Sequence, residues 1–219
     1  MHAMISPEWP APAQIVAGTT TLATPVDALP SGIAYLRQVH GADVVRLDTL
    51  RNATQPLEAD AVTGHVPGDV CAVRTADCLP VLFCSCDGGE IAAAHAGWRG
   101  LAAGVLENTV AALAADPADL LVWIGPAITQ PNFEVGGEVR EAFVASDAAA
   151  QAFFAPNARG RWQADLLGLA RQRLVAAGIT AIYGGKWCTY GDPERFHSYR
   201  RDPGCGRLVS FILIGVEPN

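Results

Sequence analysis

Two apolar segments separated by a short polar stretch constrain the fold of this chain more than any other feature. Residues 70–73 and 79–83 have the length and composition of buried strands, whereas residues 74–78 are mostly polar. Pro80 keeps Leu79 extended and lacks the N–H that a strand ladder needs. The sequence therefore predicts that residues 74–78 lie at a break in a β-sheet.

The other elements are predicted from hydrophobic periodicity and from capping residues. We expect two strands joined by a loop within residues 33–47, whereas residues 1–32 form a weakly patterned, divergent N-terminal segment with one strand. That strand is expected at residues 14–19. Further strands are expected at residues 91–94, 121–124, 179–183 and 208–214, and helices at residues 101–113, 135–145 and 165–178. Because strands and helices do not alternate strictly, we predict an α+β fold. It is a single sandwich-like domain over residues 1–219, with mixed β-sheets flanked by helices.

Charge and composition exclude several classes of partner. The 219 residues carry a net charge of −7, from 22 acidic and 15 basic side chains. This surface disfavours nucleic acid and anionic membranes, although one small anion can still bind in a local basic pocket. We find neither a signal peptide at the start nor an apolar run of about 18 residues, so we expect a cytoplasmic protein. The six cysteines are then expected to be thiols or ligands rather than disulfides.

Five histidines are candidates for chemistry. His2 lies at the chain end and His65 in a polar turn, so we expect neither to have a functional role. His40 lies at a strand end beside Gly41, and His95 ends an apolar strand just before a helix. A histidine in such a place is often a hydrogen-bonded core residue, so position alone leaves its role open.

Cys78 adds a thiol to these two imidazoles. One thiolate and two neutral imidazoles suit zinc, and three protein ligands leave a fourth position for water or substrate, as in catalytic zinc sites. The spacing of the three residues is not diagnostic, because no close Cys-x-x-Cys pair is present. Cys84 and Cys86 form a Cys-x-Cys on one strand face and are expected to be buried small residues.

Two polar clusters are candidates for substrate binding. Arg99 lies at the start of the helix predicted after His95, where a guanidinium and free backbone N–H groups suit phosphate. A surface salt bridge is the alternative for Arg99. Ser198 and Arg200 belong to a second polar cluster beside His197, for which a solvated loop is the alternative.

Several blocks of this sequence, in this order, resemble the YfiH-type "laccase-domain" family. The blocks are Gln38-Val39-His40-Gly41, Ala59-Asp60-Ala61-Val62-Thr63, Arg74-Thr75-Ala76-Asp77-Cys78-Leu79-Pro80, His95-Ala96-Gly97-Trp98-Arg99-Gly100, Ile124-Gly125-Pro126-Ala127-Ile128, Phe133-Glu134-Val135-Gly136, Cys188-Thr189-Tyr190, Ser198-Tyr199-Arg200-Arg201-Asp202 and Gly206-Arg207. The resemblance extends from about Leu36 to the C-terminus.

The resemblance implies a zinc-dependent purine nucleoside phosphorylase that acts on adenosine, inosine, guanosine and 5′-methylthioadenosine, with adenosine deamination as a further activity. The family's zinc ligands fall on His40, Cys78 and His95, so the expected partners are one zinc ion, a nucleoside and phosphate. Arg99, Ser198 and Arg200 are expected to bind substrate or phosphate, and Asp77 to orient a ligand or relay a proton. The family is also labelled polyphenol oxidase or laccase, but this chain has too few histidines for a multicopper site, so we do not expect copper.

The sequence departs from the family pattern in two places, and two alternative functions stay open. The usual N-terminal Thr-Arg-x-Gly-Gly-Val-Ser segment is reduced to Gly18-Thr19-Thr20-Thr21-Leu22, and Ala170 replaces an asparagine that is common in the family. One alternative is a cysteine hydrolase of peptidoglycan-precursor editing, with Cys78 as nucleophile and His95 as its partner. The other is a degenerate member that binds a ligand without catalysis. The sequence does not predict the oligomeric state.

Overall fold

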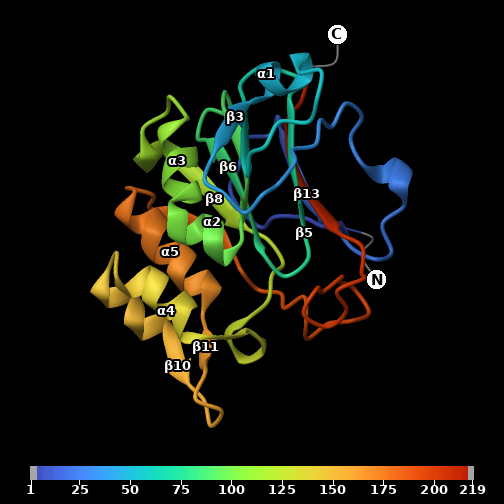
Figure 1. The fold of residues 1–219 in the computed structure, drawn as a ribbon. Helices are drawn as coiled ribbons and strands as arrows, with labels where there is room; N and C mark the ends of the chain where they lie inside the picture. Colours follow the sequence, from blue (N-terminus) through green and yellow to red (C-terminus); the bar gives the residue numbers. More distant parts are fainter. Residues whose placement is uncertain (1–3, 217–219) are drawn as a thin grey trace.

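A six-stranded mixed sheet forms the centre of the protein in the computed structural model, which describes residues 4–216 (Figure 1). His2 lies outside these residues. The strands follow the order β12-β8-β6-β7-β4-β3. Their bounds are β3 (Val44–Arg46), β4 (Ala61–Gly64), β6 (Leu79–Ser85), β7 (Ile91–Ala96), β8 (Leu120–Ile124) and β12 (Ala181–Gly184). The two outer pairs, β3 with β4 and β12 with β8, are parallel, and the inner pairs are antiparallel.

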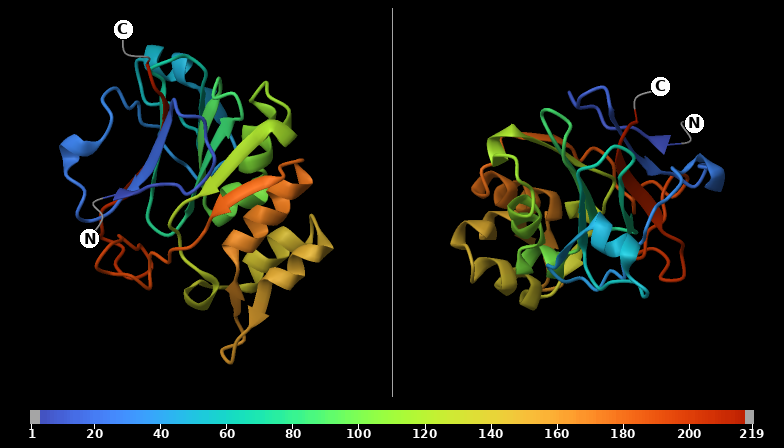
Figure 2. Two further views of the ribbon diagram at one scale, coloured as in Figure 1. Left: turned by 180° about the vertical axis from the view of Figure 1, so that it is seen from behind. Right: turned by 90° about the horizontal axis from the view of Figure 1, so that it is seen from above.

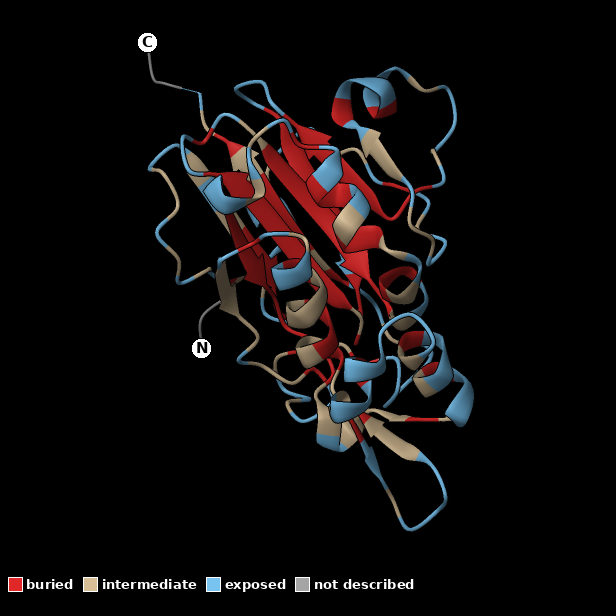
Figure 3. Cartoon of the chain, turned by 90° about the vertical axis from the view of Figure 1, so that its left-hand side faces the viewer, coloured by how far each residue is buried: buried red, intermediate tan, exposed pale blue. Residues whose placement is uncertain are grey.

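A four-stranded antiparallel sheet covers one face of the central sheet (Figure 2). Its order is β1-β2-β13-β5, and its bounds are β1 (Met4–Ile5), β2 (Ile15–Thr20), β5 (Val70–Thr75) and β13 (Leu208–Ile214). Val73 and Ile212 of this sheet pack with Leu82 and Trp123 of the central sheet in one buried cluster. The central strands are therefore buried on both faces, as Figure 3 shows in red, and this explains why they are almost continuously apolar.

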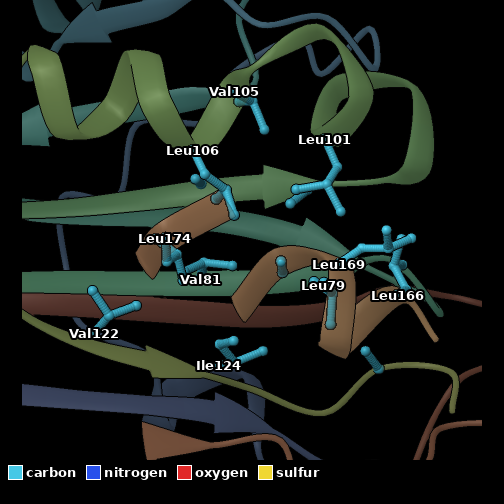
Figure 4. Close-up of a cluster of buried hydrophobic side chains, with 14 of the residues drawn as sticks. Leu79, Val81, Leu101, Val105, Leu106, Val122, Ile124, Leu166, Leu169 and Leu174 are labelled. Carbon is cyan, nitrogen blue, oxygen red and sulfur yellow. The ribbon is translucent and has the colours of Figure 1, made fainter. Parts of the chain in front are cut away.

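Helices cover the other face of the central sheet. They are α2 (Trp98–Ala103), α3 (Val105–Ala111), α4 (Gly137–Val144) and α5 (Leu166–Ala176), while α1 (Leu47–Asn52) follows β3. Leu101, Leu106 and Leu174 from this layer meet Val81 and Val122 of the sheet (Figure 4). Burying each such side chain stabilises the fold by about 1.5–3 kcal/mol. None of the helices within residues 4–216 is long and apolar enough to cross a lipid bilayer.

A small three-stranded sheet completes the fold beyond the helices. It consists of β9 (Glu134–Val135), β10 (Phe154–Pro156) and β11 (Trp162–Ala164), in the order β10-β11-β9. The hairpin of β10 and β11 projects at the bottom of Figure 1. Short 3-10 helices occur at η1 (Val26–Ala28), η2 (Pro117–Asp119), η3 (Gln130–Asn132) and η4 (Ala148–Phe153).

The expected α+β fold with mixed sheets is confirmed, and so is the break at residues 74–78. There the chain leaves β5 in one sheet and enters β6 in the other. Asp165 caps α5 by accepting a hydrogen bond from the backbone N–H of Gly168, as its sequence position predicts.

Three predicted element boundaries were wrong. The helix expected at residues 101–113 is divided at Gly104, whose φ of 96° is left-handed and ends α2. The helix expected from residue 135 begins at Gly137, because Glu134 and Val135 pair with β11 instead. Of the two strands expected within residues 33–47, only β3 forms. The earlier part makes a single bridge, between Arg37 and Glu58, and the backbone of residues 39–41 donates to the side chain of Asp60.

Candidate metal centre and active site

Three side chains that are distant in sequence meet at one end of the central sheet. Donor atoms of His40, Cys78 and His95 all lie within 4.8 Å of one another. The Sγ atom of Cys78 lies 4.0 Å from Nε2 of His40, and the two imidazole centroids are 4.7 Å apart, edge to face. His95 is 3% exposed, whereas His40 is open to solvent.

The strand register brings Cys78 and His95 together. β6 and β7 are antiparallel neighbours in which Leu79 is paired with Ala96 and Pro80 with His95. Cys78 immediately precedes β6, so it lies at the same end of the sheet as His95. The polar break before Pro80 thus places the thiol of Cys78 beside the imidazole of His95, which β7 holds in place.

Asp60 connects the third residue, His40, to this pair. Its fully buried carboxylate accepts hydrogen bonds from the backbone N–H groups of Val39 (3.1 Å), His40 (3.0 Å) and Gly41 (2.7 Å). It also accepts one from Nδ1 of His95 at 2.7 Å. The bond to Nδ1 leaves Nε2 of His95 as the ring nitrogen free to bind a metal, and the three backbone bonds replace the strand ladder that the sequence predicted near residue 38.

Asp77 supports Cys78 from the other side. Its carboxylate accepts hydrogen bonds from the hydroxyls of Thr189 (2.6 Å) and Ser198 (3.0 Å) and from the backbone N–H of Arg200 (2.7 Å). Its carbonyl accepts the N–H of Ile128 at 2.9 Å. These contacts tie the break before β6 to two later segments of the chain.

The backbone is strained at one candidate ligand and directly before another. Among the described residues other than glycine, only His40 (φ 60°) and Asp77 (φ 86°) have a positive φ. This conformation costs an ordinary residue of order 1–3 kcal/mol and is held only where the surroundings enforce it. Both residues are held by buried carboxylate hydrogen bonds, and one is a candidate ligand while the other precedes a candidate ligand.

Two glycines make room for this arrangement. A Cβ atom on Gly97 would lie 2.8 Å from Cδ2 of His40 and 3.0 Å from Sγ of Cys78, which is too close for either atom. A Cβ on Gly100 would lie 2.6 Å from the carbonyl oxygen of Gly41. The helix start after His95 can therefore lie against the other two candidate ligands only because these positions lack a side chain.

The electrostatics of the metal-free chain favour a thiolate at the centre. Burial alone would raise the pKa of the Cys78 thiol, but hydrogen bonds with His40 and His95 outweigh burial and lower this pKa to about 7. Burial alone would lower the pKa of His95, but the hydrogen bonds to Asp60 and Cys78 raise it to about 9. Burial likewise opposes ionisation of Asp60, yet its bonds from His95 and Gly41 keep its pKa below the usual value. Thiolates are the form of cysteine that binds metal.

The donor set fits a tetrahedral zinc ion. With Zn–S near 2.3 Å and Zn–N near 2.0–2.1 Å, sulfur and nitrogen ligands are about 3.6 Å apart, close to the 4.0 Å between Cys78 and His40. The hydrogen bond from His95 to a carboxylate is the support that zinc-ligating imidazoles usually have. The three residues can therefore hold a metal ion and leave one position open.

A polar cavity of about 750 Å³ opens in front of the three residues. Arg99 lines it, as expected for a phosphate-binding side chain, together with Arg74, Arg207 and Tyr199. The volume is within the usual range for small-molecule sites. The structure thus places the candidate metal ligands at the wall of a space that can hold a nucleoside and an anion.

Ser198 and Arg200, the other two expected substrate-binding residues, do not line this cavity. Ser198 is fully buried, and its hydroxyl donates to Asp77. Arg200 gives Asp77 a backbone N–H, while its guanidinium lies 5.4 Å from the ring centre of Phe133. The expectation that Cys84 and Cys86 are both buried is confirmed for Cys84, whose pKa burial raises to about 12, and was wrong for Cys86, which follows the end of β6 and is exposed.

Sequence reasoning did not assign a role to Asp60. It stood within a block that marked the family resemblance, but an aspartate before a strand gives no local sign that it will accept four hydrogen bonds. Residues 39–41 become its neighbours when β3 pairs with β4, and His95 when β4 pairs with β7. Arg74, Arg207 and Tyr199 likewise belong to blocks that resemble the family, but the sequence assigned them no role in binding.

Fold and site together define an α+β protein with a cavity built around a thiol and two imidazoles, the arrangement of a candidate metalloenzyme. The chain belongs to the YfiH-type laccase-domain family. A family model described as "Multi-copper polyphenol oxidoreductase laccase" matches residues 11–215.

Curated relatives and a solved structure agree with this membership. The chain is 46% identical to "Purine nucleoside phosphorylase PA4543" of Pseudomonas aeruginosa, over 98% of this chain and 99% of the relative. It is 55% identical to "Purine nucleoside phosphorylase YfiH" of Escherichia coli, over 85% of this chain and 75% of the relative. The crystal structure of Neisseria meningitidis protein NMB0706 superimposes with a TM-score of 0.90 at 37% identity, covering 98% of this chain and 100% of the other.

Proposed function

We propose that this protein is a zinc-dependent purine nucleoside phosphorylase. The observation that carries the proposal is the meeting of His40, Cys78 and His95 beside Arg99 in one cavity. The names of the curated relatives support the reaction class. The proposed substrates are adenosine, inosine, guanosine and 5′-methylthioadenosine together with phosphate, and adenosine deamination is a proposed second activity. Since the site depends on a free thiol, we propose that it works in the reducing cytoplasm.

In this proposal His40, Cys78 and His95 hold the zinc ion, which supplies a Lewis acid for oxygen atoms of phosphate or ribose. Arg99 binds phosphate through its guanidinium N–H groups. Asp60 keeps the Nδ1 proton of His95 in place, so that Nε2 faces the ion. Asp77 orients Cys78, and Ser198 and Arg200 serve the site by holding Asp77.

The test is phosphorolysis by the pure, zinc-loaded protein. Inosine with phosphate should yield hypoxanthine and ribose-1-phosphate in equal amounts, and leaving out phosphate should stop the reaction. Arg99→Gln should lower kcat/KM for phosphate about 10- to 100-fold, because a charge-assisted hydrogen bond contributes about 1.5–3 kcal/mol. Arg159→Gln, on the distant β10–β11 hairpin, is the matched control and should leave the rate unchanged. Failure to form hypoxanthine with zinc bound and phosphate present would refute the proposal. Binding of inosine without turnover would favour the non-catalytic alternative.

The lowered pKa of Cys78 favours a second candidate function, that of a cysteine hydrolase in peptidoglycan-precursor editing. In metal-free protein a Cys78 thiolate beside protonated His95 is expected between about pH 7 and pH 9. The Cys78 thiolate therefore stabilises the fold above its unfolded pKa, and that contribution is lost as the pH falls through about 7. The contribution of protonated His95 is complete below its unfolded pKa and is lost as the pH rises through about 9.

Alkylation of Cys78 by iodoacetamide distinguishes the two functions. In metal-free protein the rate should rise with a midpoint near pH 7, whereas an unperturbed thiol has its midpoint near about pH 8.5. In protein isolated with zinc bound, the metal should protect Cys78 from alkylation. Rapid alkylation of the protein as isolated, without zinc, would support the hydrolase and oppose the phosphorylase.

A further inference from the structure

The cavity carries more unpaired positive charge than one phosphate needs. Arg74, Arg99 and Arg207 all line it, and within residues 4–216 none of their guanidinium groups has a carboxylate partner. The described lining also includes no carboxylate, and the one further arginine there, Arg37, is paired with Glu58 at 3.0 Å. In a protein with a net charge of −7, this local excess of positive charge points to an anionic ligand.

Arg74 and Arg207 form a pair that is separate from Arg99. Arg74 of β5 lies opposite Val209 of β13, and Arg207 directly precedes β13, so both arginines lie at the same end of this sheet. Arg99 comes instead from α2, in the helical layer on the other side of the central sheet.

Each arginine of the pair rests against a tyrosine. The guanidinium carbon of Arg74 lies 5.1 Å from the ring centre of Tyr35, and that of Arg207 lies 5.7 Å from the ring centre of Tyr199. A guanidinium that lies against a ring keeps N–H groups at its edge for anion oxygens, and in Arg207 these are the groups on Nε and Nη2. Nη1 of Arg207 is further anchored by the carbonyls of Cys205 (2.8 Å) and Gly206 (3.0 Å). We call Arg74 and Arg207 with their two tyrosines the arginine–tyrosine rim.

We propose that the arginine–tyrosine rim is a second anion subsite and that it binds the 5′-phosphate of a purine nucleoside 5′-monophosphate. This inference rests on the proposed phosphorolysis, in which Arg99 already binds the attacking phosphate. Two phosphate groups then occupy one cavity, one at Arg99 and one at the rim. A volume of about 750 Å³ is compatible with a nucleotide and phosphate together.

The reaction proposed for a nucleotide needs only the nucleotide and inorganic phosphate. An oxygen of inorganic phosphate forms a bond to C1′ of the ribose, and the bond between C1′ and N9 of the purine breaks. The electron pair of that bond stays with the base, which takes the proton released by phosphate. The products are the free purine and ribose 1,5-bisphosphate.

The experiment compares inosine 5′-monophosphate with inosine under saturating phosphate. The ratio of their kcat/KM values should exceed one in the native protein. It should fall by about tenfold or more in both Arg74→Gln and Arg207→Gln, because each removes a charge-assisted contact to the 5′-phosphate. Arg159→Gln should leave the ratio unchanged. Melting temperatures within a few degrees of the native protein establish that the variants fold.

Several outcomes would overturn the inference. These are a native preference for inosine, a ratio that neither variant changes, or a preference that disappears in Arg99→Gln alone. If neither substrate is cleaved, the proposed function fails. Equilibrium binding of the two compounds then tests the anion subsite independently of turnover. Tighter equilibrium binding of inosine 5′-monophosphate than of inosine, lost in both variants, would then support the rim. Equal binding of the two would refute it.

Discussion

The two ends of the cavity are built in different ways. At the inner end, His40, Cys78 and His95 are held by the buried carboxylates of Asp60 and Asp77, and the backbone is strained beside them. At the outer end, the arginine–tyrosine rim consists of exposed side chains, which are held by contacts between guanidinium groups and rings and by the bonds from Arg207 to neighbouring carbonyls, and Tyr199 is 53% exposed. Rigidity is therefore concentrated where a metal requires fixed geometry. The rim can adapt to the ligand.

The largest effect is expected from removing the thiol at the inner end. Cys78→Ala should abolish zinc binding, because two imidazoles alone do not complete the site. The fold should survive, since a chain of this length buries enough apolar surface without a structural metal. Elemental analysis after dialysis against a weak chelator measures the bound zinc. His40→Ala and His95→Ala should also lose zinc, and full zinc occupancy in any of these variants would remove that residue from the ligand set.

A smaller loss is expected when the support of a ligand is weakened rather than the ligand itself. Asp60→Asn keeps the shape of the side chain but removes the charge that orients His95, so zinc affinity should fall about 10- to 100-fold. Chelator competition measures the affinity. Asp48→Asn is the control, because Asp48 of α1 is an exposed carboxylate paired with Arg46 at the end of β3. Native affinity in Asp60→Asn would show that the inner end does not depend on this carboxylate.

Substitution of Asp77 tests whether this second carboxylate stabilises the fold as well as positioning Cys78. Asp77→Ala leaves the hydroxyls of Thr189 and Ser198 without their acceptor, which should cost about 1–3 kcal/mol of unfolding free energy. Urea denaturation of the metal-free protein measures the loss. Asp87→Ala, at an exposed turn, should cost less. Equal losses in the two variants would contradict a special role for Asp77.

The smallest effect is expected at the rim. Tyr199→Ala removes the ring beneath Arg207, and an exposed cation–π contact contributes about 0.5–1 kcal/mol. Preference for inosine 5′-monophosphate over inosine should therefore fall only about two- to fivefold, with zinc content unchanged. A loss of zinc in this variant would show that the rim and the metal ligands are not independent.

The sequence predicted the parts of this molecule that depend on local patterns. The α+β class, the capped helix α5 and the break before Pro80 follow from periodicity and from the chemistry of single residues. The division of a helix at Gly104 was missed because a glycine within a helical pattern is often tolerated. The strand expected before His40 does not form, because the buried carboxylate of Asp60 bonds the backbone of residues 39–41 instead.

The candidate site was predictable in its ligands but not in its support. His40, Cys78 and His95 were identified through the family resemblance, whereas residue types and spacing alone left their role open. The bracing by Asp60 and Asp77 depends on contacts between residues up to 123 positions apart, such as the bond from Arg200 to Asp77. The pairing of Arg74 with Arg207 likewise depends on the register of β5 and β13, which local sequence does not specify.

The central claim is that the inner end of the cavity binds zinc through His40, Cys78 and His95. The most direct test is a crystal structure of the unmodified protein with diffraction data collected on both sides of the zinc absorption edge. We predict one zinc peak per chain, about 2.3 Å from Sγ of Cys78 and about 2.0–2.1 Å from one nitrogen of each histidine. A peak elsewhere, or stoichiometric copper at these residues in a protein that oxidises phenols, would contradict the claim.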